Sequence, residues 1–270
     1  MSDERHRAKR SLDQNFLVDH NLQRKIVASL GASPDDEVLE IGPGRGALTR
    51  HLVGSVRRLV LVELDNDLAA KWAEEYADRD DVVVVHGDVL ATDLSAVLDS
   101  PEKALVVGNI PYNITSPIIF KLLEPPRPRD VVLMVQSEVA DRVAAQVGTK
   151  AYGALSVGVR SVARAKRLFG VGRGAFRPVP GVDSAILRIT PEHPAPMDTG
   201  EEAALRVLVR ASFQWRRKQL QKILRDHPDL RVPTDSLDRL AEITEIDLSA
   251  RPETLSPQVF MRLSAALPRA

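Results

Sequence analysis

The 270-residue sequence contains no cysteine, which excludes disulfide bonds, thiolate metal sites and a cysteine nucleophile. Aromatic residues make up only 4 % of the chain. No apolar run approaches the roughly 18 residues that a membrane-spanning helix needs. Residues 1–10 are polar and charged and lack the apolar stretch of a secretory signal. We therefore expect a cytoplasmic protein that is neither secreted nor inserted in a membrane.

The chain also lacks an excess of either charge, since it has 37 basic and 37 acidic residues. Net charge therefore predicts no polyanionic partner, but the distribution of charge does. Residues 160–177 and 205–225 contain basic residues and no acidic ones: Arg160, Arg164, Lys166, Arg167, Arg173 and Arg177, then Arg206, Arg210, Arg216, Arg217, Lys218, Lys222 and Arg225. Together with the basic N-terminal arm, these runs favour a surface that binds a polyanion over a merely solvated face.

Short apolar segments alternate with helix-length amphipathic segments over the first two thirds of the chain. The expected strands are 37–41, 58–63, 82–86, 104–108, 131–136 and 184–189. The expected helices are 20–30, 46–53, 67–77, 116–123, 138–146 and 154–163. This alternation predicts a parallel, doubly wound α/β sheet with helices on both faces. The run Val82–Val85 is apolar throughout, which is typical of a strand buried on both faces.

Three prolines interrupt every periodic pattern in residues 191–198, which we interpret as a linker. Only helix signals follow it. One helical arc is expected to carry Leu205, Val209, Phe213, Leu220, Ile223 and Leu224. The predicted organisation is a first domain over residues 1–190 and a small helical domain over residues 199–270.

A glycine-rich turn, Gly42-Pro-Gly44-Arg-Gly46, separates the first expected strand from a helix. Glycines in such a turn let the backbone approach a ligand closely. Their spacing differs from the dinucleotide pattern, because the third glycine comes one residue early. Glu63 ends the second strand at the same sheet edge, where a carboxylate can accept hydrogen bonds from ribose hydroxyls. A nucleoside cofactor is indicated, the alternatives being a simple tight loop and a surface glutamate.

Polar and aromatic residues follow the next two strands. Asp88 comes after the third strand and could accept a hydrogen bond from an exocyclic amine of adenosine, although a loop or capping role is also open. The fourth strand ends in Asn109-Ile110-Pro111-Tyr112. The Asn109 oxygen and the Ile110 carbonyl could accept both hydrogens of an aromatic amine while Tyr112 stacks on its ring. The alternative is an ordinary turn with a surface tyrosine.

These residues resemble the KsgA-type ribosomal RNA adenine dimethyltransferases and, more distantly, the Erm-type enzymes. The resemblance covers nearly the whole chain. Its motifs are Gln14–Leu17, Glu40–Gly44, Glu63–Asp65, Gly108–Ile114, Gln136 with Glu138, Ala151–Gly153, Ala175–Ala185, and Phe213 with Arg216–Lys218. Two positions depart from the family pattern: Asp13 replaces a glycine, and Trp215 replaces a glutamine.

The resemblance implies a class I, Rossmann-like methyltransferase fold dependent on S-adenosylmethionine, with a small all-α C-terminal domain. It implies methyl transfer to the N6 amines of two adjacent adenines in the 3′-terminal hairpin of small-subunit (16S) rRNA during ribosome biogenesis. The implied cofactor contacts are Asn15, Leu17, Gly42, Gly44, Glu63, Asp88 and Asn109. The implied catalytic residues are Asn109, Ile110, Pro111, Tyr112 and Phe176, with Tyr112 and Phe176 as the rings that hold adenine.

The second acid-free run is interpreted as a basic helix of the C-terminal domain, and we expect Arg216, Arg217, Lys218 and Lys222 on it to bind RNA electrostatically. We expect small-subunit rRNA or a pre-ribosomal small subunit as partner, a monomer, and no metal.

Three alternative functions stay open. An Erm-like enzyme acting on large-subunit (23S) rRNA would share the cofactor residues, but residues 175–185 and 213–218 favour the KsgA type. A non-catalytic ribosome-assembly or RNA-binding factor, or a transcription factor on the same fold, is disfavoured by the intact Asn109–Tyr112 motif. A hydride-transfer enzyme is disfavoured by the glycine spacing and by Asp88.

Overall fold

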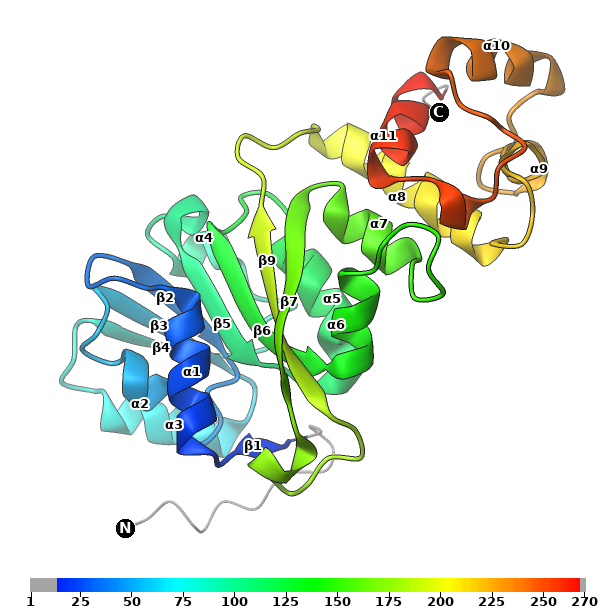
Figure 1. The fold of residues 1–270 in the computed structure, drawn as a ribbon. Helices are drawn as coiled ribbons and strands as arrows, with labels where there is room; N and C mark the ends of the chain where they lie inside the picture. Colours follow the sequence, from blue (N-terminus) through cyan, green and yellow to red (C-terminus); the bar gives the residue numbers. More distant parts are fainter. Residues whose placement is uncertain (1–13, 268–270) are drawn as a thin grey trace. The chain divides into compact units, whose positions relative to one another are not determined.

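The computed structural model of the chain describes residues 14–267 (Figure 1). The basic N-terminal arm and Asp13, which the sequence singled out, lie outside the described residues. The chain forms two compact units. The first contains the residues up to Ala140 and Ala165–Pro191, and the second contains Asp141–Arg164 and the residues from Glu192 onward.

A seven-stranded sheet organises the first unit, in the order β4-β3-β2-β5-β6-β9-β7. The strands are β2 (Glu37–Ile41), β3 (Arg58–Glu63), β4 (Val82–His86), β5 (Leu105–Asn109), β6 (Asp130–Gln136), β7 (Ala163–Val171) and β9 (Ser184–Pro191). The strands from β4 to β6 pair in parallel, as predicted. The order reverses between β2 and β5, which is where open α/β sheets bind ligands.

Two features of the sheet differ from the prediction. Strand β9 runs antiparallel to β6, and β7 was not predicted at all. Strand β7 lies at the sheet edge and its basic residues are largely exposed, so it lacks the apolar run by which buried strands are recognised.

Burial follows position in the sheet. Strand β2 is buried along its whole length, and β3 and β6 are buried at all but one position, so helices must cover both faces there. The expectation that Val82–Val85 is buried on both faces was wrong. Strand β4 is the other edge of the sheet, where Val83, Val84 and Val85 are only partly buried and His86 is exposed.

The helices of this part are α1 (His20–Leu30), α2 (Thr49–Leu52), α3 (Asn66–Glu75), α4 (Leu94–Val97), α5 (Thr115–Leu122) and α6 (Ser137–Val143). Helix α1 begins where Asp19 accepts hydrogen bonds from two backbone N–H groups and ends at Gly31 with a φ of 67°. Helix α2 begins later than predicted, because Gly46, the first residue of the predicted helix, has a φ of 81°, which a right-handed helix does not allow.

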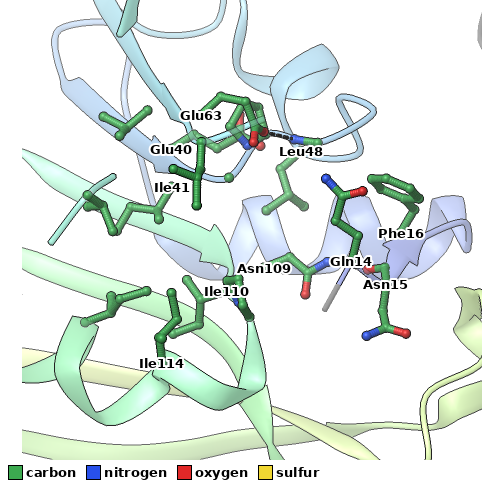
Figure 2. A pocket seen from close by; sticks show the side chains of 18 of the residues that line it. Gln14, Asn15, Phe16, Glu40, Ile41, Leu48, Glu63, Asn109, Ile110 and Ile114 are labelled. Carbon is green, nitrogen blue, oxygen red and sulfur yellow. Dashed lines mark hydrogen bonds between the residues drawn. The ribbon is translucent and has the colours of Figure 1, made fainter. Parts of the chain in front are cut away.

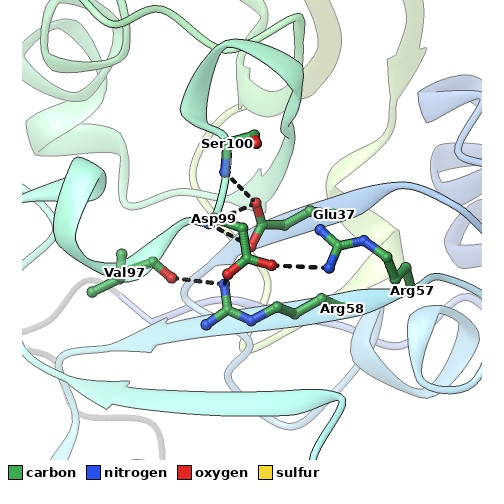
Figure 3. A network of polar contacts seen from close by, with 6 residues as sticks. All are labelled: Glu37, Arg57, Arg58, Val97, Asp99 and Ser100. Carbon is green, nitrogen blue, oxygen red and sulfur yellow. Dashed lines mark hydrogen bonds and ion pairs between the residues drawn. The ribbon is translucent and has the colours of Figure 1, made fainter.

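An ionic network closes the amino-terminal edge of the sheet (Figure 3). The buried Glu37 carboxylate, at the start of β2, pairs with Arg58 at the start of β3. It also accepts hydrogen bonds from the backbone N–H groups of Asp99 (3.0 and 3.1 Å) and Ser100 (3.2 Å). Arg58 donates to the Val97 carbonyl at 3.0 Å. This network ties the two strands to the chain after α4, at the edge opposite the carboxyl ends of the strands.

The second unit is helical, with α7 (Ala154–Arg160), α8 (Thr199–Gln214), α9 (Leu220–Asp226), α10 (Thr234–Thr244) and α11 (Pro257–Ala266). Asp198 and Glu201 form a capping box at the start of α8. The predicted single arc from Leu205 to Leu224 is divided between α8 and α9, which are separated by residues 215–219.

The division into units differs from the predicted boundary at residue 190, because residues 141–164 group with the C-terminal helices. Tyr152 explains this grouping. Its side chain is fully buried in the apolar core of the second unit, and its hydroxyl donates to the Leu255 carbonyl at 2.7 Å. The Gly148 N–H also donates to the Glu253 carbonyl at 2.8 Å.

Candidate active site

A cavity of about 270 Å³ opens at the carboxyl ends of β2, β3 and β5 (Figure 2). All the residues that line it belong to the first unit. Of the predicted site residues, it brings together Asn15, Leu17, Gly42, Gly44, Glu63, Asp88, Asn109, Ile110, Pro111 and Tyr112. Predicted site residues that are spread between positions 15 and 112 of the sequence therefore line one cavity.

The glycine turn after β2 is held by side chains from two other elements. Glu63 accepts a hydrogen bond from the Gly44 N–H at 2.9 Å, and Trp72 of α3 donates to the Gly44 carbonyl at 3.1 Å. A Cβ atom at Gly46 would lie 2.5 Å from the Trp72 ring, so only glycine fits there. These contacts hold the turn in place where Gly42 and Gly44 line the cavity.

Two buried carboxyl groups lie beside this turn. Burial raises the pKa of Glu63, while hydrogen bonds from the Asp65 and Gly44 N–H groups oppose the rise. Burial raises the pKa of Glu40 to about 8, and the neighbouring Glu63 adds to the rise while Thr49 opposes it. The buried Oε2 of Glu40 has no hydrogen-bond partner. Glu40 is therefore mostly protonated at neutral pH.

The segment before α1 closes the site from a third side. Gln14 donates to Asp65 Oδ2 at 3.0 Å, and the Asn15 carbonyl accepts a hydrogen bond from Asn109 Nδ2 at 2.9 Å. Strand β1 (Phe16–Leu17) follows and pairs with β8 (Phe176–Arg177). The Arg45 guanidinium lies 4.5 Å from the centre of the Phe16 ring. The Gln14–Leu17 motif is thus hydrogen-bonded to residues at the carboxyl ends of β3 and β5.

The Asn109–Tyr112 stretch has a defined orientation. Because Asn109 Nδ2 is bound to the Asn15 carbonyl, its Oδ1 is the atom available to accept a hydrogen bond. The Tyr112 hydroxyl is 2.6 Å from the hydroxyl of the buried Ser184 on β9. Asp88 accepts a hydrogen bond from the Leu90 N–H at 2.9 Å, which holds its carboxylate at the cavity wall.

The structure does not bring Phe176 to the cavity. Its side chain is fully buried in the apolar core of the first unit, where its backbone pairs with Leu17. Since the ring has no exposed face, it cannot stack on a base in this arrangement. Phe176 instead supports Leu17, which does line the cavity.

Residues 5–259 match the ribosomal RNA adenine dimethylase family. The chain is 42 % identical over 265 residues to a protein named ribosomal RNA small subunit methyltransferase A from Geobacillus thermodenitrificans, covering 96 % of this chain and 90 % of that protein. It is 40 % identical over 263 residues to the protein of the same name from Pseudomonas aeruginosa, covering 97 % and 95 %.

The chain belongs to the ribosomal RNA adenine dimethylase family. Two solved structures agree in fold. A dimethyladenosine transferase from Plasmodium falciparum has a TM-score of 0.80 at 25 % identity, covering 92 % of this chain and 95 % of that one. The 23S rRNA methyltransferase ErmE has a TM-score of 0.71 at 28 % identity, covering 94 % and 99 %. The fold is therefore the class I, Rossmann-like methyltransferase fold, as the resemblance implied.

As a member of this family, the protein is an rRNA adenine dimethyltransferase that depends on S-adenosylmethionine. The cavity fits that cofactor on its own geometry: a glycine turn held in place, the Glu63 and Asp88 carboxylates for hydroxyl and amine donors, and apolar walls from Leu64 and Val89. Within residues 14–267, no group of three or more acidic or histidine side chains could hold a metal ion. None of the helices described combines the length and apolarity needed to cross a bilayer.

The basic residues predicted to bind RNA lie in the second unit but not on one helix. Arg216, Arg217 and Lys218 occupy the connection between α8 and α9, and Lys222 lies on α9. Arg217, Lys218 and Lys222 are exposed. Arg216 instead donates to the Lys150 (3.2 Å) and Thr149 (3.3 Å) carbonyls, which is a structural role. The description of this run as a basic helix was wrong.

In the folded protein, part of the positive charge of the second acid-free run is balanced by nearby acids. Arg206, Arg210 and Arg225 each lie within 4.0 Å of an acid from outside the run: Glu202, Asp229 and Asp226 respectively. Trp215 packs its ring edge-on against His227, with 5.0 Å between the ring centroids.

Glu40 and Leu64 are among the cavity residues to which the sequence analysis gave no role. Glu40 was quoted within a motif but given no role, although an acid inside the apolar strand Glu37–Ile41 is itself a signal. Leu64 follows Glu63 and is 46 % exposed, unusual for a leucine next to a buried strand. An exposed apolar side chain beside a ligand carboxylate indicates a wall for a planar ring.

Proposed function

We propose that this protein transfers methyl groups from S-adenosylmethionine to the N6 amines of two adjacent adenines in the 3′-terminal hairpin of small-subunit rRNA. Its partner is that rRNA or the assembling small subunit, and it acts as a cytoplasmic monomer. Curated relatives at about 40 % identity that carry the name small subunit methyltransferase support this choice of substrate.

The observation that carries the chemistry is the orientation of Asn109. Its amide nitrogen is engaged by the Asn15 carbonyl, so its Oδ1 accepts one hydrogen of the adenine amine. Ile110 follows the last residue of β5 that pairs with β6, and its carbonyl accepts the other. Pro111 has no N–H, so it offers no donor that would compete for these acceptors.

Two acceptors make the adenine nitrogen a better nucleophile. Its lone pair is delocalised into the ring, and hydrogen bonds from both N–H groups favour a nitrogen whose lone pair is localised. They also stabilise the positive charge that develops on this nitrogen. When bound, S-adenosylmethionine supplies a methyl group activated by its sulfonium. The methylated nitrogen is strongly acidic and loses its proton to water, so no side chain is needed as a general base.

Tyr112 positions the base. Its hydroxyl is anchored to Ser184, which holds the ring at the cavity wall, and the adenine stacks on that ring. The base must be unstacked from its RNA neighbours before it can enter the cavity, which is how enzymes that modify nucleobases reach their target atoms. Phe176 takes no part in this step, since it is buried in the core.

The proposal is tested by methyl transfer from radiolabelled S-adenosylmethionine to isolated small and large ribosomal subunits that lack these modifications, followed by mapping of the labelled nucleotides. We expect label in the small subunit at two adjacent adenines, each carrying two methyl groups.

Label confined to the large subunit would overturn the proposal in favour of the function that the ErmE structure carries in its name. An absence of label in both subunits, with intact cofactor binding, would favour a non-catalytic RNA-binding factor.

A further inference from the structure

A second cleft, of about 310 Å³, lies between α1 and α2 on the first unit and is separate from the cofactor cavity. It is lined by Arg24, Val27, Ala28, Gly31, Ala32, His51, Leu52, Ser55 and Val56. Most of these side chains are small or apolar, and the charge-bearing ones are Arg24 and His51. No residue of this cleft belongs to the site described above.

Basic side chains lie at this cleft: Arg24 and His51 line it, and His20 and Arg50 are near enough to shift the pKa of His51. His20 and Arg24 come from α1, and Arg50 and His51 come from α2. We call these four residues the α1–α2 basic surface. Burial lowers the pKa of His51, and the positive charges of Arg24, His20 and Arg50 lower it further. An imidazole that is harder to protonate because of its cationic neighbours indicates a positive electrostatic potential at this point.

A buried glutamine orients the two histidines. Gln23 is 4 % exposed and donates from Nε2 to the Leu17 carbonyl at 3.1 Å, so its Oε1 points away from that carbonyl. His20 Nδ1 and His51 Nε2 lie 3.0 and 3.4 Å from this oxygen. Because the amide oxygen can only accept, each of these ring nitrogens carries its hydrogen. The histidines are therefore held in place beside Arg24.

The charge of Arg24 is not neutralised within the part of the chain that the structure describes. Its guanidinium donates to the neutral Asn21 side chain at 2.6 Å and pairs with no acid among residues 14–267. Arg79 and Arg57, two other exposed arginines of the first unit, differ in this respect: they lie 2.6 and 2.9 Å from Asp81 and Asp99. A guanidinium without an acidic partner beside a shallow cleft can bind a phosphate in a bidentate manner.

We propose that the α1–α2 basic surface binds the phosphate backbone of the RNA substrate. The proposal rests on the proposed function, because the polyanion it takes is the rRNA that the protein methylates. Arg24 holds a phosphate through two N–H groups, and His51 adds a third donor when protonated. This contact is made by the first unit, so it is independent of Arg217, Lys218 and Lys222 in the second unit.

The test compares Arg24→Gln with Arg79→Gln, which removes the same charge at a site where Asp81 already pairs with it. Binding of a small-subunit rRNA 3′-terminal fragment is measured over a salt series by filter binding or fluorescence anisotropy. We expect Arg24→Gln to raise Kd about two- to fivefold at 0.1 M salt and to make the slope of log K against log [salt] shallower by roughly 0.7–0.9. Arg79→Gln should behave as the unmodified protein does.

Equal affinities and equal salt slopes for the two variants would overturn the proposal. Thermal melting checks that both variants are folded. We expect them to be, because Arg24 and Arg79 are exposed side chains. Because binding is measured without methyl transfer, this result is distinguishable from a failure of the proposed function. That failure would appear as no methyl transfer by the unmodified protein.

A second measurement uses His51→Gln. A bound phosphate favours the protonated imidazole, so the Kd of the unmodified protein should fall between pH 8 and pH 6, and His51→Gln should flatten that dependence. The charged groups facing His51 are Arg24, His20 and Arg50, and the arginines keep their charge over this range. An identical pH dependence in both proteins would exclude His51 from the contact.

Discussion

At the residue scale, both carboxylate oxygens of Glu63 are bound to the backbone: they accept from the Gly44 and Asp65 N–H groups, each at 2.9 Å. Glu63 also lines the cavity, and we propose that it accepts hydrogen bonds from the cofactor hydroxyls. On that proposal, removing it loosens the glycine turn and deletes a ligand contact together. A surface glutamate would have neither effect.

We expect Glu63→Ala to weaken S-adenosylmethionine binding by one to two orders of magnitude, about 1.5–3 kcal/mol for lost hydrogen bonds to a charged group. Isothermal titration calorimetry measures this directly. Glu74→Ala, on the exposed side of α3, is the matched control and should bind normally. Unchanged affinity in Glu63→Ala would remove this residue from the cofactor site.

Glu40 predicts a pH dependence of stability. Its pKa is about 8 in the folded protein, above its ordinary value of 4.5, so the folded state holds a proton that the unfolded state releases. Stability should therefore fall as pH rises from about 5 through 8, at about 1.4 kcal/mol for each unit of pKa difference. Glu40→Gln resembles the protonated form and cannot titrate.

The measurement is thermal melting of the protein and of Glu40→Gln between pH 6 and pH 9. The unmodified protein should lose more melting temperature over this range than the variant, and the variant should be the more stable of the two at pH 9. Parallel pH profiles would show that Glu40 is not protonated in the folded state.

At the scale of secondary-structure elements, the network around Glu37 joins β2, β3 and the chain after α4 (Figure 3). It lies at the edge of the sheet opposite the cavity, so it should govern stability and not cofactor binding. Glu37 is buried, whereas Asp99 in the same network is 48 % exposed at its side chain.

Glu37→Ala removes the buried carboxylate that pairs with the partly buried Arg58 guanidinium and leaves Arg58 its ion pair with the exposed Asp99, at 3.2 Å. It also leaves the Asp99 and Ser100 N–H groups without their acceptor. We therefore expect a loss of about 3 kcal/mol in unfolding free energy. Asp99→Ala, within the same network, should cost less than about 1 kcal/mol because its ion pair is exposed. Urea unfolding measures both. A Glu37→Ala variant as stable as Asp99→Ala would contradict this account of the sheet edge.

The connection between α8 and α9 should contact RNA through Arg217 and Lys218, and α9 through Lys222. We expect replacement of all three by Ala to weaken rRNA binding and to make its salt slope shallower by roughly 2–3, since about 0.7–0.9 is lost for each phosphate contact. Cofactor binding should be unchanged. The slope is obtained from binding at several salt concentrations.

A matched control removes three arginines whose charges are already paired: Arg206, Arg210 and Arg225. This variant has the same net charge as the triple variant above. If both lower the salt slope equally, the basic connection is not a specific RNA contact but part of a general positive field.

For the whole molecule, local sequence patterns predicted the parallel sheet and its cavity. Strands β2, β3 and β4 match the predicted ranges, because each is a short apolar run bounded by turns or polar residues. Since parallel strands end at one edge of the sheet, the sequence predicts that residues at or just after these ends lie together: Glu63, Asp88 and Asn109.

The features that the sequence did not predict depend on contacts between residues that are far apart in the chain or lie outside the pattern considered. The burial of Phe176 depends on β1 pairing with β8 across about 160 residues, and no local pattern reports that contact. The grouping of residues 141–164 with the C-terminal helices depends on Tyr152 reaching the Leu255 carbonyl. The acids that pair with Arg206, Arg210 and Arg225 lie outside the acid-free run that contains these arginines.

The central claim is that Asn109 accepts a hydrogen of the target amine in the cofactor cavity. The most direct measurement is single-turnover methyl transfer to small-subunit rRNA by Asn109→Ala, at saturating S-adenosylmethionine, beside thermal melting of the same variant. We predict a rate lowered by roughly 10²–10³, the effect of removing one preorganised polar group that stabilises a transition state, with little change in RNA affinity. An Asn109→Ala variant that is destabilised by about 1 kcal/mol but methylates at the unmodified rate would contradict the claim.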